Sequence, residues 1–287
     1  MNNNMNTFKY IKIGVIALVL IASTITIWDQ IEYRFGLGIW ADDGLYSEES
    51  DGEVGFLDAS CTVAGVQFHG ALYTYYDQES QAMDDVSTSE DIAYYLSVAE
   101  DASNIEVILL EIDSYGGSPV AAQEVVETMQ KYVTKPIVVQ IREAGDSAGY
   151  YVASAGDHII ASALSDVGSI GVTMSYVDAS DSNKKEGYTY NQISTGKFKD
   201  SGDPQKMLTT EEKALFQRDV DITHEAFVQT VATNRSMDIE SVRALADGSA
   251  MLGEMALEKG LIDQVGGYYD VLEYIEGEYY VDPVVCW

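Results

Sequence analysis

The chain has 287 residues, enough for one large domain with appendages, and its 46% hydrophobic content is that of a globular protein. Its charge is unusual, because 16 Lys and Arg residues face 47 Asp and Glu residues, for a formal net charge of −31. Such an acidic surface repels polyanions, so nucleic acid is excluded as an expected partner, and it suits either high solubility or a high-salt habitat.

The first 28 residues predict a membrane anchor. Residues 1–12 are polar and Asn-rich, and residues 13–28 are sixteen consecutive uncharged positions. Lys9 and Lys12 precede this stretch and Asp29 follows it, which predicts a cytoplasmic tail at 1–12 and places the bulk of the chain outside the cytoplasmic membrane. A cleaved signal peptide is the alternative, although no Ala-x-Ala-like sequence follows Trp28. We therefore predict a single-pass transmembrane helix at 13–28.

Residues 29–60 are acidic with scattered Gly and predict a linker, after which strands and helices alternate. In chain order, we first expect a strand at 63–69, a helix from Thr88 or Ser89 to Asn104, and a strand at 105–112 that ends in a turn at 113–117. A helix then runs from Pro119 to about Tyr132, with Ser118 as its N-cap. A strand at 137–141, a short helix at 150–155 and a strand at 158–162 follow. This alternation predicts an α/β fold with a mainly parallel sheet.

The second half of the chain is more helical. A Tyr-rich strand is expected before residue 194, and Thr209 or Thr210 begins a long helix that runs to about Arg235. Two shorter helices are expected at 239–245 and 254–259. The aromatic and acidic tail at 273–287 indicates no chemistry.

Ser147 lies in the run GDSAGYY, between a predicted strand and a predicted helix. Small neighbours allow close approach to its hydroxyl, and a following helix would direct free N–H groups at the space beside it. This is the local arrangement of a nucleophile with an oxyanion site. A plain N-cap at the start of the helix is the alternative.

A serine nucleophile needs a base. His69, His158 and His224 lie in no Gly-rich or turn-forming motif, so the sequence does not support a Ser-His-Asp triad. Lys197 and Lys199 lie in the run STGKFKDSG at 194–202. Because a lysine accepts a proton only when neutral, a working lysine is expected to be buried, whereas an ordinary surface lysine is not.

Gly116 and Gly117 follow a predicted buried strand, and their N–H groups can approach a ligand without obstruction, although a tight turn is the alternative. The chain has no phosphate-binding glycine motif and no Cys/His cluster, so neither a cofactor nor a metal is expected. Cys61 and Cys286 could pair outside the membrane, but they lie far apart in the sequence.

Five segments occur in a set order: LLEIDSYGGSPVAAQEV, GDSAGYYVASAGDHIIAS, DVGSIGV, TGKFKDSGDP with LTTEEK, and GEMALEKGLIDQVGG. Together they resemble the SppA family of signal peptide peptidases, which are serine/lysine proteases with a crotonase/ClpP-like fold. The resemblance spans about residues 63–272. It implies a protease domain of repeated strand–helix units at 61–272, followed by a C-terminal tail at 273–287.

By position in these motifs, the resemblance implies that Ser147 is the nucleophile and Lys199 the general base. Ser169 would hydrogen-bond the lysine, and the N–H groups of Gly116 or Gly117 and of Ala148 would form the oxyanion hole. The resemblance also implies peptide substrates such as remnant signal peptides. It further implies a homo-oligomeric ring in which the Ser and the Lys can come from neighbouring subunits.

The chain departs from the family pattern at several positions. Tyr115 stands where the family has Pro, and Ala148 stands where it has Gly. Asp146 replaces a small apolar residue, and its carboxylate would favour a charged Lys199. Gly248-Ser249 replaces a frequent Gly-Arg and is expected to touch no catalytic group.

The sequence therefore favours a membrane-anchored serine endopeptidase whose catalytic domain is extracytoplasmic and acts on apolar peptides. Asp146 and Tyr115 motivate an alternative, a crotonase-like binding or scaffold protein without activity. An acyl-CoA enzyme on the same fold is disfavoured, because the acidic surface does not suit the phosphates of CoA.

Overall fold

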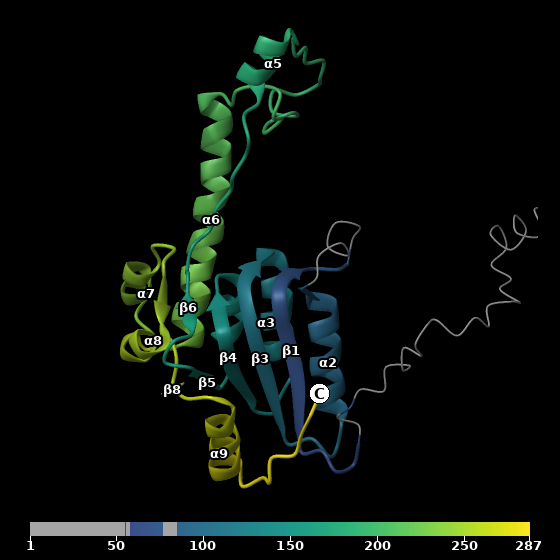
Figure 1. Cartoon of the computed structure of the whole chain (residues 1–287), viewed down its shortest axis with the longest axis vertical. Helices are drawn as coiled ribbons and strands as arrows, with labels where there is room; N and C mark the ends of the chain where they lie inside the picture. Colours follow the sequence, from purple (N-terminus) through teal and green to yellow (C-terminus); the bar gives the residue numbers. More distant parts are fainter. Residues whose placement is uncertain (1–54, 56–57, 77–84) are drawn as a thin grey trace, which may run out of the picture. The chain divides into compact units, whose positions relative to one another are not determined.

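A nine-stranded, mainly parallel sheet organises the structure, which is a computed structural model that describes residues 55, 58–76 and 85–287 (Figure 1). The strands are β1 (Val63–Tyr73), β2 (Val86–Thr88), β3 (Val107–Gly117), β4 (Ile137–Asp146), β5 (His158–Ala161), β6 (Asp166–Gly168), β7 (Ala250–Leu252), β8 (Gln264–Val265) and β9 (Val285–Cys286). Their order is β2-β1-β3-β4-β5-β8, with β6 beside β4 and β9 beside β1. Within the described sheet the one antiparallel pair joins β6 to β7. The predicted α/β class with a mainly parallel sheet is confirmed.

Strand β3 shows that the sheet is buried on both faces. All side chains from Val107 to Ile112 are buried, as the continuous apolar run predicted. The predicted turn at 113–117 is wrong, because β3 continues through these residues. Gly116 and Gly117 pair with Ala71 and Leu72 of β1, beyond an irregularity in the register. The glycines thus bring β3 to the end of the sheet where β4 also ends.

The helices are α2 (Ser89–Asp101), α3 (Pro119–Lys131), α4 (Ala148–Ala153), α5 (Ser180–Glu186), α6 (Thr210–Asn234), α7 (Ile239–Leu245), α8 (Gly253–Lys259) and α9 (Tyr268–Tyr279). Helices α2, α3, α4 and α6 pack with one face of the sheet in the larger apolar core. Helix α9 covers the other face, where Val271 and Ile275 meet residues such as Leu109. The site-bearing strands are therefore held between two apolar layers.

Three predicted helix starts are confirmed by capping hydrogen bonds. Thr88 accepts from Asp91 N in α2, and Ser118 accepts from Ala121 N in α3, where Pro119 is the first helical residue. Thr209 and Glu212 form a capping box at the start of α6. These bonds satisfy backbone donors that the helices themselves leave free, so the start positions were readable from the sequence.

Residues 172–209, called the arm below, join β6 to α6. Figure 1 shows α5, which belongs to the arm, beside the end of α6 that is remote from the sheet. Apart from Ser180 and Leu208, the residues of the arm are partly or fully exposed. The Tyr-rich strand expected before residue 194 is wrong, because no residue between Gly187 and Thr209 is in a strand.

The C-terminal segment belongs to the sheet. Helix α9 extends to Tyr279, and β9 pairs with Val63 and Ala64 of β1. Cys61 and Cys286 form a disulfide with a Cα–Cα distance of 5.9 Å, which answers the question that the sequence left open. The disulfide ties the last strand to the start of the first long one across a separation of 225 residues.

The expected membrane anchor falls on residues that the structure does not describe. The segments 1–12 and 13–28, and almost all of 29–60, lie outside the described residues. Within the described ranges, no helix has both the length and the apolar character needed to cross a membrane.

Candidate active site

Ser147 occupies the connection between β4 and α4 in a conformation that is rare for residues other than Gly. Its φ is 50° and its ψ is −117°, and its hydroxyl makes no capping bond to the helix. Its N–H donates to Gly168 O at 2.9 Å, which fixes the turn to β6. The interpretation of Ser147 as a side-chain cap is therefore wrong. A strained serine between a strand and a helix is the geometry of a nucleophile elbow.

Gly116 lies directly against this serine. A Cβ added to Gly116 would lie 2.8 Å from Ser147 Cβ, 3.1 Å from Ser147 Oγ and 3.2 Å from Ala148 N, and the φ of Gly116 is +119°. Glycine thus keeps open the space in front of the hydroxyl. Ala148 is the first residue of α4, so its N–H has no acceptor within the helix. This N–H can therefore serve as an oxyanion donor.

Gly117 packs against β1 rather than against Ser147. A Cβ at Gly117 would lie 2.2 Å from Leu72 O, so Gly117 is required by the packing of β3 against β1. The N–H of Gly116 already donates to Ser114 Oγ at 3.0 Å, and that hydroxyl donates to Gly70 O at 2.6 Å. Of the three predicted oxyanion residues, Gly116 and Ala148 border Ser147.

Ser169 is brought close to Ser147 by the pairing of β4 with β6, in which Asp146 is opposite Gly168. Ser169 has a φ of 46°, and its hydroxyl donates to Gly248 O at 3.1 Å. Its N–H donates to Ser249 O, also at 3.1 Å. The expectation that Gly248-Ser249 touches no catalytic candidate is therefore wrong, because this dipeptide holds Ser169 in place.

Asp146 places a buried carboxyl beside the nucleophile. It is 6% exposed, and its Oδ1 finds no hydrogen-bond partner in the described part of the chain. Burial, followed by repulsion from Asp166, raises the pKa of Asp146 to about 6. Asp166 is opposite Ala144 in the strand next to β4, two positions before Gly168, so the two carboxyl groups are diagonal neighbours on one face. As the pH rises through about 6, the Asp146 carboxyl therefore loses its proton and places a negative charge beside Ser147.

Lys199 is not near Ser147 in the same chain. Ser201, two residues after Lys199, donates from its Oγ to Glu212 Oε1 at 3.2 Å in the first turn of α6. By contrast, α4 packs against the other half of α6, where Tyr151 and Phe227 have ring centroids 5.3 Å apart. Phe227 lies fifteen residues after Glu212, which is about 22 Å of helix and beyond the reach of a lysine side chain.

Lys199 also differs from its expected environment. It is exposed, and its ammonium makes no ion pair with any described residue, whereas the sequence argument required a buried base. Lys197, its neighbour in the motif, pairs with Glu211 at 2.7 Å, with both side chains 62% exposed. The chain therefore presents the lysine to solvent rather than to its own serine.

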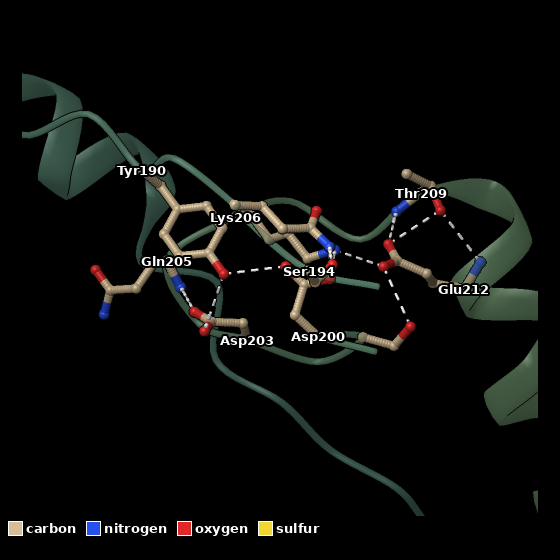
Figure 2. Close-up of polar contacts among 10 residues, drawn as sticks. Tyr190, Ser194, Asp200, Asp203, Gln205, Lys206, Thr209 and Glu212 are labelled. Atoms are coloured by element: carbon tan, nitrogen blue, oxygen red, sulfur yellow. Dashed lines mark hydrogen bonds and ion pairs between the residues drawn. The ribbon is translucent and has the colours of Figure 1, made fainter. Parts of the chain in front are cut away.

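A half-buried lysine in the same region was not predicted from the sequence. Lys206 Nζ lies 2.5 Å from Glu212 Oε1 and 3.2 Å from Asp200 Oδ1 (Figure 2). The hydrogen bond to Glu212 raises the pKa of Lys206, and the bond to Lys206, together with those to Thr209, lowers the pKa of Glu212 to about 2. Lys206 is thus held charged and is unsuited to act as a base. The capping box Thr209–Glu212 was readable from the sequence, but its link to Lys206 was not.

The three histidines are engaged away from Ser147. His69 Nε2 lies 3.0 Å from Glu111 Oε1, and the ring of His158 stacks on Tyr274 with centroids 3.7 Å apart. His224 Nε2 lies 3.0 Å from Ala246 O. None of these contacts involves Ser147, which agrees with the absence of a triad motif.

Comparison with known proteins gives consistent matches. The model of peptidase family S49 matches residues 129–282. A putative protease of Methanocaldococcus jannaschii is 34% identical over 65% of this chain and 61% of its own length. A putative signal peptide peptidase SppA of Enterococcus faecium is 34% identical over 61% of this chain and 51% of its own length. The chloroplastic serine protease SPPA of Arabidopsis thaliana is 29% identical over 62% of this chain and 27% of its own length. The chain thus spans between about a quarter and three fifths of these relatives.

Proposed function

Because the chain belongs to peptidase family S49, the family of SppA-type peptidases, we propose that it is a serine endopeptidase with Ser147 as nucleophile. The observation that carries the proposal is the strained Ser147 at the start of α4, with the side-chain-free Gly116 in front of its hydroxyl and the Ala148 N–H beside it. The expected substrates are apolar peptides such as remnant signal peptides. This expectation comes from the family and from the predicted anchor.

In the proposed mechanism, Ser147 Oγ attacks the carbonyl carbon of the scissile peptide bond, and a neutral Lys199 accepts the hydroxyl proton. The Ala148 N–H stabilises the negative oxygen of the tetrahedral intermediate. The lysine then donates the proton to the leaving amine, and an acyl-enzyme remains. Water, deprotonated by the same lysine, releases the acyl group and restores Ser147. Because the proton acceptor must be neutral, activity is expected to rise with pH.

We infer that Lys199 comes from another copy of the chain. The contacts of α6 separate the lysine of one subunit from its own serine by about 22 Å of helix. The arm exposes large apolar side chains, as expected for a segment that docks on a neighbour; examples are Ile193 at 98%, Val177 at 75% and Tyr188 at 65% exposure. A homo-oligomeric ring would bring the arm of one subunit to the serine of the next.

The proposed location is the outer side of the cytoplasmic membrane, with a single-pass anchor at 13–28. The disulfide between Cys61 and Cys286 supports an oxidising compartment, because such bonds rarely persist in the cytosol. The anchor prediction rests on the sequence. Fractionation of cells, followed by protease treatment of intact cells, would test both the membrane association and the side.

A mixing experiment tests the mechanism. Ser147→Ala and Lys199→Ala should each abolish hydrolysis of an apolar fluorogenic peptide. Refolded together in equal amounts, the two variants should recover roughly a quarter of wild-type activity, because about one interface in four would join an intact Ser147 to an intact Lys199. Recovery near zero, with normal oligomers, would place both residues in one subunit or assign the base elsewhere.

Asp146 keeps a second candidate open, a binding or scaffold protein without activity, because its carboxylate opposes a neutral lysine. A serine-directed probe distinguishes the two. Labelling of the wild type that is lost in Ser147→Ala supports the peptidase. A correctly assembled protein that is unlabelled from pH 6 to pH 10 would support the scaffold.

A further inference from the structure

The residue next to Lys199 is the centre of a hydrogen-bonded network. Asp200 Oδ1 accepts from Gln192 Nε2 at 2.6 Å and pairs with Lys206 Nζ at 3.2 Å, and Asp200 Oδ2 accepts from Tyr190 OH at 3.0 Å (Figure 2). Three donors therefore hold one carboxylate, which fixes the backbone that carries Lys199.

Lys206 connects this centre to the first turn of α6. Its Nζ lies 2.5 Å from Glu212 Oε1, and Glu212 Oε2 accepts from Thr209 N at 2.8 Å and from Thr209 Oγ1 at 3.0 Å. The motif around Lys199 is thus joined through Asp200, Lys206 and Glu212 to a long rigid helix. The capping box serves two purposes, because it starts α6 and also orients the carboxylate that receives Lys206.

The side chains of the network are largely shielded from solvent, although they lie beside a mostly exposed arm. The side chains of Asp200, Lys206 and Glu212 are 15%, 19% and 3% exposed. Within the arm, the buried residues are Ser180 and Leu208, and the others are partly or fully exposed. Buried ion pairs contribute little net stability, because desolvation offsets their attraction, but they favour one arrangement over others. Because few apolar side chains of the arm are buried, we expect these three side chains to contribute strongly to its shape near Lys199.

We propose that Asp200, Lys206 and Glu212 are positioning residues, which hold the Lys199 segment in the one conformation that presents the lysine to Ser147 of another copy. This proposal rests on the proposed function. Its physical basis is that a catalytic group displaced by about 1 Å can lose roughly 100-fold in rate, whereas substrate binding elsewhere is unaffected. The network contacts neither substrate nor Ser147, so its effect should appear in kcat rather than in KM.

Lys206→Met in the full-length chain is the first test. We expect kcat for an apolar fluorogenic peptide to fall about 30-fold to 100-fold, with KM within about twofold of wild type. Lys206→Arg should restore kcat to within about threefold, because a guanidinium can bridge the same two carboxylates. The matched control is Lys197→Met in the same segment, which removes an exposed pair with Glu211 and should change kcat less than about twofold.

Limited trypsin cleavage after Lys199, carried out in a Ser147→Ala background, supplies a readout that does not need activity. Lys206→Met should speed this cleavage about tenfold, while Lys206→Arg should not. An unchanged melting temperature and oligomeric state would show that the sheet and the assembly are intact.

Two results would overturn the positioning role. One is a Lys206→Met protein with wild-type kcat and wild-type cleavage. The other is a Lys206→Arg protein as inactive as Lys206→Met, which would indicate that Lys206 transfers the proton itself, because arginine does not become neutral. Lys199→Met separates this outcome from failure of the dyad. If Lys199→Met is active, the proposed function is wrong. If Lys199→Met is inactive and Lys206→Met is fully active, the proposed function stands and only the positioning role of the network is wrong.

Discussion

Ser147 and Lys199 are carried by two regions that are built by different means. The serine lies where β3, β4 and β6 end, on a sheet buried by apolar layers on both faces. The lysine lies in an exposed arm, whose order near Lys199 comes from ion pairs and hydrogen bonds to α6. Dense apolar packing can maintain a strained backbone, as at Ser147, while a polar network can order a segment that remains exposed, as at Lys199.

The largest expected effect comes from closing the space in front of Ser147. Gly116→Ala should lower kcat/KM roughly 1000-fold, because the new Cβ would lie 3.1 Å from Ser147 Oγ and 3.2 Å from the Ala148 N–H. Gly196→Ala in the arm is the matched control, since its φ is +85° and no described atom lies within 4 Å. Steady-state kinetics should show a loss at Gly196 of less than about tenfold. Equal losses would contradict the assignment of the oxyanion space to Gly116.

Removal of the disulfide should weaken the sheet and leave the arm unchanged. The double variant Cys61→Ser with Cys286→Ser should lose about 3–4 kcal/mol in free energy of unfolding, because the bond closes a loop with a sequence separation of 225 residues. Guanidinium unfolding measures this change. Trypsin cleavage after Lys199 is the control. If the double variant were also cleaved faster after Lys199, the arm would depend on the stability of the sheet.

Asp146 should make the serine region pH-sensitive. Its pKa is raised to about 6 by burial, so the folded state holds the proton more tightly and loses stability as pH rises from about 4 through 6. Asp146→Asn should therefore raise the free energy of unfolding by about 2 kcal/mol at pH 8 and by almost nothing at pH 4. The same variant should shift the rise of activity to lower pH, because a carboxylate near the incoming lysine favours its charged form. A stability gain that is equal at both pH values would point to packing rather than charge.

The smallest effect is expected at the surface of the arm. Lys197→Met should change the free energy of unfolding by less than about 0.5 kcal/mol, since Lys197 and Glu211 are both 62% exposed and water screens their attraction. Differential scanning calorimetry at low and high salt would measure this change. A larger loss that persists at high salt would point to the second contact of Lys197, in which its Nζ lies 5.2 Å from the centroid of the Phe198 ring.

The sequence by itself determined the local features. Apolar runs predicted the buried cores of β3 and β4, and capping residues predicted the starts of α2, α3 and α6, because these signals depend on neighbouring residues. The order of five motifs identified the family, which the comparisons confirm. It also singled out Ser147 as the candidate nucleophile.

Only the tertiary structure decided how distant residues meet. The extension of β3 through Gly117, the contact of Gly116 with Ser147 and the disulfide all depend on strand register. The separation of Lys199 from Ser147 depends on which ends of a 25-residue helix contact the arm and α4. Motif order carries no information about such distances, because helix length and packing set them. The same serine and lysine that read as one site in the sequence therefore lie at two separate places in the folded chain.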